Sequence, residues 1–477
     1  MGVNAHARTD KADIHRALST FDKPAIRRYQ KRTRLADLSH LPGTWGVPFF
    51  GHLYWMLTDL HAWLDQQYAQ YGPVFRARTP RLDSVFMLGP EANSLVFQNE
   101  NKIFSNFLAW DQVFATLFDN NLLERDFTDH KANRRILQSA FKRPAIEGHM
   151  ELMNPMLRDG ILSWQTGSTI SAMGHVKTLL LNTGARVFLG TEAAAESQKL
   201  NQAFTAVVAA TADPFKRKEI WFSPYARGLK GRQVLNDYMM ASIPQRRSQP
   251  GRDLFSQVCQ LRDDDGAFFS DEEICDHIIF VLFAAHDTTT SALCAVLYAL
   301  ATNPDWQEEL REEMFSLNKE AVEFDDVPLL QKTGLTLKEA LRMYPALSVM
   351  PRYTLEEFEF QGHRIPADSI VTVSTLFTHY MPEYWNDPHT FDPYRFSPER
   401  AEEKQDFFQY VPFGGGAHKC LGMHFSEVQS KIFLFHLLKN FRVSKDPRMT
   451  RYRYNNVPLT FPTDGLPLQF ERIQVPA

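Results

Sequence analysis

The stretch VPFGGGAHKCLGMHF, from Val411 to Phe425, contains the strongest indication of how this chain folds and what it binds. It places Cys420 shortly after three consecutive glycines and directly before an apolar helical pattern. Glycines permit a tight turn and the close approach of a flat macrocycle, and loop amides can hydrogen-bond a thiolate sulfur. The loop, which also contains Phe413, therefore favours a metal-bound thiolate at Cys420.

Two other interpretations of this loop remain open from the residues alone. Cys420 could be a structural cysteine beside a glycine-rich turn, or it could join His418 and His424 in a zinc site. A phosphate-binding loop is excluded, because no Gly-Lys-Ser or Gly-Lys-Thr follows the glycines.

Composition indicates an ordinary globular protein. The chain has 477 residues, of which 44% are apolar and 23% charged, and its formal net charge is −4. These values argue against disorder and against a global field that attracts nucleic acid, so no nucleic-acid partner is expected. No linker-like stretch divides the chain, and we expect a polar N-terminal arm at residues 1–40 followed by one large domain at 41–477.

The cysteines and the apolar runs bear on where the protein is located. The four cysteines contain no CxxC pair, which is typical of a reducing cytosol, and the N-terminus lacks the apolar core of a secretory signal. The longest apolar runs, 278–285 and 292–301, each fall short of the roughly 20 residues that a membrane span needs. The sequence therefore predicts a soluble cytoplasmic protein with at most weak peripheral membrane contact.

Apolar periodicity predicts a mainly α-helical protein with small β-sheets. A helix is expected over 61–71, and the segments from Val74 and Val85 should form a hairpin. A helix of roughly thirty residues should begin after Ser270 and end at Asn303, because serine is a good N-cap and proline follows Asn303. Such a helix must cross most of the molecule.

Two further patterns carry chemistry. Asp287 and Thr288 interrupt the apolar face of the long helix, and a buried carboxylate is rare unless it is paired or functional. Glu339 and Arg342 are three residues apart on a predicted helix and so share one face, where Arg395 can join them. Taken alone, that pair could be a surface salt bridge, and the threonine could bond back to a helix carbonyl.

In combination, these patterns resemble the signatures of the cytochrome P450 superfamily, the haem-thiolate monooxygenases, in their soluble bacterial form. The loop matches the haem-binding signature FxxGxxxCxG, the long helix contains AAHDTT, and the ExxR pair is followed by FDPYRF. The resemblance extends over about residues 41–470 and implies the P450 fold, a single large domain around haem b, with Cys420 as the iron ligand. It also implies that Glu339, Arg342 and Arg395 form a buried structural triad that braces the haem loop.

The resemblance assigns further residues to the haem and to oxygen chemistry. Asp287 and Thr288 would relay protons to bound dioxygen, while Ala285 stands where glycine is commoner and should narrow the oxygen groove slightly. The haem propionates would be bound by two histidines and two arginines, with His418 standing where arginine is usual. These four residues are His130, Arg134, Arg352 and His418.

The implied reaction is hydroxylation of a lipophilic small molecule with dioxygen and two electrons. No flavin or dinucleotide fingerprint is present, so a separate ferredoxin or flavodoxin, with its reductase, should supply the electrons to a monomeric enzyme. An acidic carrier would meet Lys131, Arg135 and Lys419.

The implied substrate pocket is apolar and aromatic, which favours a steroid, a terpenoid or a long-chain lipid. Its expected lining comes from residues 104–123 and 459–466, together with Ala284, Val349 and Met350. Two alternative functions remain: a peroxide-driven peroxygenase, and a haem-binding or metal-binding protein without turnover.

Overall fold

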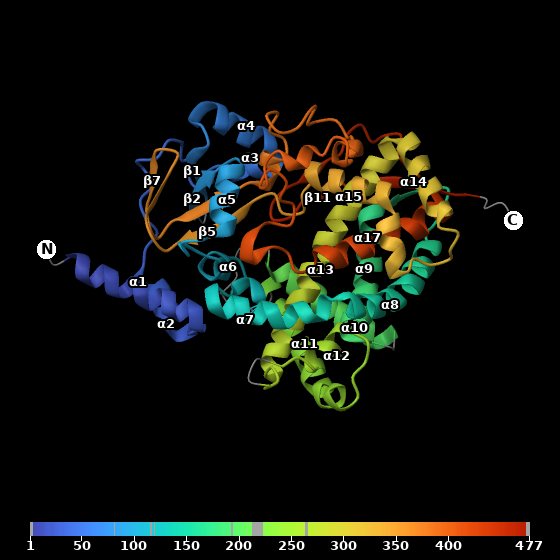
Figure 1. The fold of residues 1–477 in the computed structure, drawn as a ribbon, viewed down its shortest axis with the longest axis horizontal. Coiled ribbons are helices and arrows are strands. Elements are labelled where there is room, and N and C mark those ends of the chain that lie inside the picture. The colour runs from blue at the N-terminus through green and yellow to red at the C-terminus, as the bar shows by residue number, and fades with distance from the viewer. Residues whose placement is uncertain are drawn as a thin grey trace.

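The computed structural model describes residues 3–80, 82–114, 117–118, 120–191, 194–211, 223–262 and 266–473. Within these ranges the chain is mainly helical and carries small sheets, which confirms the predicted fold class. Figure 1 shows β1, β2, β5 and β7 on the side where the N-terminus lies, together with α1 to α5, and most of the longer helices on the side toward the C-terminus.

The described elements have the following bounds. The helices are α1 (Val3–Thr20), α2 (Lys23–Arg32), α3 (Leu53–Thr58), α4 (Leu60–Tyr71), α5 (Pro90–Gln98), α6 (Phe107–Phe114), α7 (Phe127–Gln138), α8 (Arg143–Leu162), α9 (Ala172–Leu189), α10 (Ala194–Thr211), α11 (Pro224–Ser248), α12 (Leu254–Cys259), α13 (Asp271–Thr302), α14 (Pro304–Ser316), α15 (Gln331–Met343), α16 (Thr375–Thr378) and α17 (Met423–Asn440). The strands are β1 (Val74–Thr79), β2 (Leu82–Met87), β3 (Phe104–Ser105), β4 (Thr169–Ser171), β5 (Met350–Thr354), β6 (Phe358–Phe360), β7 (His363–Ile365), β8 (Ile370–Val373), β9 (Phe441–Lys445), β10 (Tyr454–Asn455), β11 (Phe461–Pro462) and β12 (Pro467–Arg472).

Helix α13 is the central element, and its predicted ends are confirmed. Ser270 accepts a hydrogen bond from the Glu273 amide while the Glu273 side chain accepts one from the Ser270 amide, so a capping box begins the helix. Pro304 begins α14 directly after the Asn303 cap. By length and composition α13 could cross a membrane, but 67% of its most apolar window is buried inside the protein. It is therefore the core helix, packed against α9, α11, α15 and α17.

The five-stranded sheet has the order β1-β2-β8-β5-β3, in which only the β2–β8 pair is parallel. Strands β1 and β2 form the predicted hairpin, and α4 confirms the predicted helix before it. Strand β5 pairs with β8 so that Arg352 lies opposite Val371. The sheet thereby holds one of the predicted cofactor residues on a central strand. A second sheet, β4-β12-β9, joins the C-terminal strand β12 to the strand that follows α17.

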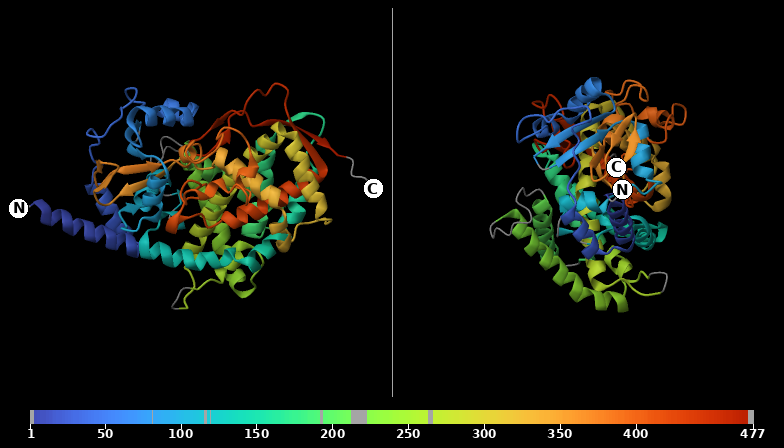
Figure 2. Two further views of the ribbon diagram at one scale, coloured as in Figure 1. Left: turned by 45° about the horizontal axis from the view of Figure 1, so that its top comes forward. Right: turned by 90° about the vertical axis from the view of Figure 1, so that its left-hand side faces the viewer.

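Residues 1–40 contain two helices, α1 and α2, where the sequence predicted a polar arm. Their buried side chains, among them Leu18 and Ile26, pack against Leu108, Tyr353 and Leu355. Figure 2 shows α1 extending away from the body of the molecule toward the N-terminus. A few apolar side chains on these helices are enough for this packing. Because residues 1–40 are polar overall, their composition did not predict the contact. The domain boundary at residue 40 stays a prediction.

Candidate active site

The loop around Cys420 is shaped by close backbone contacts. The Cys420 amide donates a hydrogen bond to the Phe413 carbonyl at 2.9 Å, which closes a turn before α17 begins. Gly416 has a φ of +61°, and a Cβ atom there would lie 1.9 Å from the carbonyl oxygen of Phe97 on α5. Only glycine fits this position, because a side chain would collide with backbone.

The side chain of Cys420 differs from the other three cysteines, which are buried. Part of the Cys420 side chain is exposed to solvent. The protein that surrounds the sulfur still removes enough water to raise the pKa of the thiol. The Gly422 amide and the charges of Arg134 and Lys419 oppose that rise. A metal that binds this sulfur must displace the thiol proton, and those three groups favour the resulting thiolate.

The zinc interpretation finds no support in the described part of the chain. No group of three or more His, Cys, Asp or Glu side chains there could hold a metal ion. His418 instead stacks on His130, and His424 lies 3.7 Å from Glu427 on the exposed side of α17. A metal at Cys420 would therefore take no other His, Cys, Asp or Glu ligand from the described residues, which suits a metal whose remaining ligands come from a macrocycle.

The four residues predicted to bind propionates come from three elements. His130 and Arg134 lie one turn apart on α7, Arg352 is on β5, and His418 ends the short 3₁₀-helix η7 (Gly416–His418). The rings of His130 and His418 stack with centroids 3.8 Å apart. Burial, reinforced by nearby arginines, lowers the pKa of His130 to about 3 and that of His418 well below its ordinary value. The imidazoles are thus neutral, and the arginines make the cluster cationic.

A buried carboxylate lies beside this cluster, and the sequence analysis did not identify it. Asp126 Oδ1 lies 4.0 Å from His418 Nε2, and burial raises the Asp126 pKa to about 6. Asp126 occupies the N-cap position of α7, yet its side chain makes no capping bond there and accepts hydrogen bonds from the Asn106 and Phe107 amides at 2.8 and 3.2 Å. It therefore caps α6 instead, a contact between segments twenty residues apart that no local pattern predicts.

Glu339, Arg342 and Arg395 meet in the interior of the protein. Arg342 donates from Nε and Nη2 to the two Glu339 oxygens at 2.7 and 2.9 Å, and Arg395 Nε donates to Oε1 at 3.1 Å. All three side chains are fully buried, so the surface salt-bridge interpretation of this pair is wrong. Arg395 also donates to Glu402 Oε2 at 2.8 Å, which adds a second carboxylate that the motif did not include.

His379 connects this triad to the cysteine loop. The Val411 amide donates to His379 Nε2 at 3.0 Å, so the ring must carry its proton on Nδ1, which lies 3.1 Å from the Arg342 carbonyl. The His379 carbonyl in turn accepts from Arg342 Nη1 at 2.8 Å. Burial lowers the pKa of His379 to about 3, which keeps this tautomer neutral. No motif identified His379, because its role depends on which two segments it joins.

On α13, Thr288 is half-buried and its hydroxyl donates to the Ala284 carbonyl at 2.6 Å, the back-bonded arrangement considered from the sequence. The neighbouring Asp287 is buried, with Lys177 Nζ from α9 and His286 Nδ1 each 2.9 Å from its Oδ1. Burial alone would raise the Asp287 pKa, but the adjacent His286 ring and Lys177 ammonium outweigh it and lower the pKa.

An aromatic cluster lies along α13 next to Ala284. The ring of Phe283 is 5.6 Å from that of Phe114 and 4.5 Å from that of Phe118, and Phe280 approaches the same two rings. The structure thus brings the 104–123 segment against α13, as the predicted pocket requires, although residues 115, 116 and 119 of that segment lie outside the described ranges.

Two other predicted pocket residues lie closer to the cysteine loop and the sheet. Met350 is buried, and its Sδ would be 3.7 Å from a Cβ atom on Gly414. Val349 is half-buried and packs against the cluster that contains Phe377. Met350 also belongs to the same buried hydrophobic cluster as Val411, at the start of the loop.

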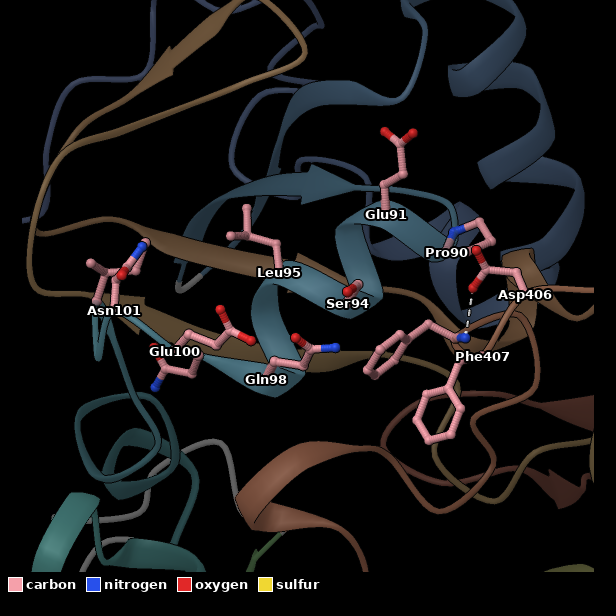
Figure 3. A pocket seen from close by; sticks show the side chains of 12 residues that line it. Pro90, Glu91, Ser94, Leu95, Gln98, Glu100, Asn101, Asp406 and Phe407 are labelled. Carbon is pink, nitrogen blue, oxygen red and sulfur yellow. Dashed lines mark hydrogen bonds between the residues drawn. The ribbon is translucent and has the colours of Figure 1, made fainter.

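A surface groove lies between α5 and the segment 406–408 (Figure 3). Phe408 Cε1 in its wall would be only 2.9 Å from a Cβ atom on Gly415. None of the predicted pocket residues lines this groove. Its lining consists of Pro90, Glu91, Ser94, Leu95, Gln98, Asn99, Glu100, Asn101, Ile103, Asp406, Phe407 and Phe408.

Comparison with known proteins decides the family. The family model described as cytochrome P450 matches residues 41–470. This chain belongs to the cytochrome P450 family. The putative cytochrome P450 136 of Mycobacterium tuberculosis is 33% identical over 447 residues, which cover 91% of this chain and 89% of that protein. As a P450, the protein is a monooxygenase that uses a haem-thiolate iron.

More distantly related proteins also match over most of this chain. The putative cytochrome P450 120 of Synechocystis sp. is 27% identical over 86% of this chain and 92% of its own, and the taxoid 7-beta-hydroxylase of Taxus cuspidata is 26% identical over 91% and 90%. The solved structure of retinoic acid bound cyanobacterial CYP120A1 superposes with a TM-score of 0.82 over 92% of this chain and all of that chain, at 24% identity. The fold is therefore the P450 fold.

The residues around Cys420 fit a haem. The accessible sulfur is the soft ligand that iron accepts in this family, and the glycine at position 416 lets the loop pack against α5 without a side chain. The cationic cluster of Arg134, Arg352 and two neutral imidazoles complements the two negative charges of haem propionates.

Proposed function

We propose that this cytochrome P450 hydroxylates a lipophilic small molecule, of the steroid, terpenoid or long-chain lipid class. The observation that carries the proposal is the aromatic cluster of Phe114, Phe118, Phe280 and Phe283, which lies beside Ala284 on the helix that bears Asp287. An apolar wall with few polar groups selects a ligand by burial of its carbon skeleton. Two similar proteins, by their names, bind retinoic acid or hydroxylate a taxoid, and both molecules are lipophilic.

The cofactor in this proposal is haem b, bound through Cys420. Arg134, Arg352, His130 and His418 bind its propionates; guanidiniums make the stronger, charge-assisted contacts and neutral imidazoles the weaker ones. When bound, the haem supplies the activation of dioxygen, assisted by electron donation from the thiolate.

The remaining residues hold the loop and handle protons. Glu339, Arg342 and Arg395 fix α15 against the segment that precedes the loop, so that Cys420 stays in one position. Asp287 relays protons toward Thr288, whose hydroxyl oxygen can accept a further hydrogen bond while it donates to Ala284. Proton delivery at this point favours hydroxylation over the release of peroxide.

Electrons come from a separate ferredoxin or flavodoxin in this proposal. Lys131 and Arg135 are exposed one turn apart on α7, and Lys419 is exposed beside Cys420. Lys419 and Arg134, the neighbour of Arg135 on α7, both act on the Cys420 thiol by their charge. We therefore propose that these three exposed cations attract an acidic carrier. The enzyme acts as a cytoplasmic monomer.

The absorption spectrum of the reduced protein under carbon monoxide tests the ligand. The wild type should show the red-shifted Soret band of thiolate-bound haem, and Cys420→Ala should lose it. Cys294→Ala is the matched control, because Cys294 is buried on α13 and burial raises its thiol pKa to about 12. A wild type without this band, in folded protein, would contradict the proposal.

A screen of steroids, terpenoids and fatty acids for spin-state shifts then tests the substrate class. A shift with at least one class, followed by a hydroxylated product with reduced ferredoxin and dioxygen, supports the proposal. Product formation with peroxide alone, and none with the carrier, would favour the peroxygenase alternative.

A further inference from the structure

Helices α1 and α2 form an N-terminal helix pair that lies outside the segment matched by the cytochrome P450 family model, which begins at residue 41. Buried contacts nevertheless join this pair to the rest of the protein. Leu18 and Ile26 are 1% and 0% exposed and belong to the same hydrophobic cluster as Leu108 on α6. The Tyr29 hydroxyl on α2 donates to Asp368 Oδ1, close to β8, at 2.5 Å. The helix pair is therefore held against both α6 and the sheet, because its removal would expose apolar surface on both sides of the contact.

Several side chains of the helix pair contact α6 directly. The ring of Phe21, between α1 and α2, meets the ring of Phe107 edge-on, at 5.9 Å between centroids. On α2, Gln30 Nε2 donates to Asp111 Oδ2 at 3.2 Å, and Arg27 Nη2 lies 4.0 Å from Asp111 Oδ1. Asp111 is only 4% exposed, so the amide and the guanidinium stabilise a buried carboxylate on α6.

The helix pair also contacts the residues that hold the start of α6. Asp126, whose carboxylate caps α6, is followed by Phe127, and the Phe127 ring stacks on His15 of α1 with centroids 5.5 Å apart. Directly before Asp126, the guanidinium of Arg125 lies over the ring of Phe21 at 4.3 Å. The position of α6 thus depends on the helix pair both through its own side chains and through the segment that caps it.

The other end of α6 bears part of the aromatic cluster beside α13. Phe107, Asp111 and Phe114 are four and three residues apart, so they share one face of the helix. The ring of Trp110 stacks on that of Phe114 with centroids 5.4 Å apart, and Phe114 meets Phe283 on α13. In Figure 1, α6 lies between the helix pair and α13. Because the eight residues of α6 form one helix, a displacement at Phe107 also displaces Phe114.

We propose that the N-terminal helix pair is a specificity-determining element, in which Arg27 and Gln30 are positioning residues that fix α6 and thereby the shape of the substrate pocket at Phe114. This inference rests on the proposed function, because it concerns the pocket that the aromatic cluster lines. A bulky lipophilic ligand extends to Phe114 and depends on this positioning, whereas a small ligand of the iron does not.

Hydrogen exchange of the haem-loaded protein tests the first step, the positioning of α6. The double variant Arg27→Ala with Gln30→Ala removes both contacts with Asp111, so the backbone amides of α6 should exchange at least about threefold faster than in the wild type. Arg28→Ala with Lys31→Ala is the matched control, because these neighbours on the same helix are exposed. The control should leave the exchange of α6 unchanged.

Spectral titration with two haem ligands tests the second step, the effect on the pocket. Clotrimazole is an imidazole with bulky aryl groups, and its Kd should rise about fivefold in the double variant, because α6 no longer holds Phe114 against the ligand. Unsubstituted imidazole is too small to contact this wall and should bind with unchanged affinity. In the background of Phe114→Ala, the double variant should have no further effect on the Kd of clotrimazole, because the helix pair acts through that ring.

The possible failures give different results. Unchanged exchange of α6 in the double variant, or faster exchange with an unchanged Kd for clotrimazole, would overturn the inference while the proposed function stands. If Phe114→Ala alone leaves the Kd of clotrimazole unchanged, the aromatic cluster does not line the ligand site, and the proposed pocket fails together with the inference. An equal rise in Kd for imidazole and clotrimazole would mean that the double variant disturbs the haem site itself, which also contradicts the inference.

Discussion

The two sides of the site differ in how their buried charges are held. On the cysteine side, Glu339, Arg342 and Arg395 are fully buried, and neutral His379 joins them to Val411. On the α13 side, the charge of Asp287 is paired with a partly exposed Lys177. The difference is physical: ions sealed from water resist rearrangement because any partner left unpaired is costly, whereas an ion pair open to solvent exchanges protons readily. One side holds the loop that carries Cys420, and the other keeps its buried charge in contact with a partly exposed lysine.

The largest expected effect comes from removing one of the buried charges on the cysteine side. Glu339→Ala leaves Arg342 and Arg395 buried without their shared carboxylate, which should lower the free energy of unfolding by about 3–5 kcal/mol. Little or no protein with bound haem should result, as measured by the carbon monoxide spectrum per mole of chain. Glu308→Ala is the control: it pairs with Arg311 at the same i,i+3 spacing but is 42% exposed, and should cost under about 1 kcal/mol.

A backbone substitution tests the fit of the loop against α5. Gly416→Ala places a Cβ atom 1.9 Å from the Phe97 carbonyl oxygen at a φ of +61°, so the loop must shift. We expect a loss of roughly 2–3 kcal/mol in urea unfolding, together with weaker haem retention. Gly148→Ala, on α8, meets only Arg252 atoms at 4.0 Å at an ordinary φ and should lower neither stability nor haem retention. Equal losses in both variants would mean that the contact with Phe97 is unimportant.

The pH dependence of stability tests the neutral His379 bridge. Its pKa is about 3 in the folded protein and about 6.5 when unfolded, so the unfolded chain binds the proton first. Its contribution to stability is complete above pH 6.5 and is lost as the pH falls toward 3, by about 2 kcal/mol at pH 5.

The variant His379→Gln isolates this contribution. Urea unfolding at pH 7 and pH 5 should show a smaller loss of stability on acidification in the variant than in the wild type. Other buried histidines, such as His277, titrate in both proteins. The contribution of His379 is therefore the difference between wild type and variant in how steeply the free energy of unfolding changes with pH. Identical slopes would mean that His379 is protonated without unfolding.

The smallest expected effect concerns the substrate side. Phe283→Ala removes the ring that contacts Phe114 and Phe118, which should weaken binding of the lipophilic ligand about tenfold, as measured by the spin-state titration. The carbon monoxide spectrum should stay that of the wild type, since the cysteine side is untouched. Phe407→Ala removes a ring that is 84% exposed near the surface groove and should leave ligand affinity unchanged.

The features visible in the sequence are those that depend on short spacings. The capping box at Ser270, the shared face of Glu339 and Arg342, and the glycines before Cys420 all follow from residues within a few positions of each other. Such contacts are determined by helix and turn geometry, which is the same in every protein. The P450 signature is itself a set of such spacings, so the family could be predicted from the sequence, and Cys420 could be proposed as the iron ligand.

Contacts between distant segments were decided by tertiary packing alone. Asp126 caps α6 rather than α7, His379 joins the Arg342 carbonyl to the Val411 amide, and Lys177 reaches Asp287 from another helix. The packing of α1 and α2 on Leu108 and Tyr353 belongs with them. No local spacing encodes these pairs, because each depends on which surfaces are buried against each other when the whole chain folds, and burial then sets the charge that each group carries.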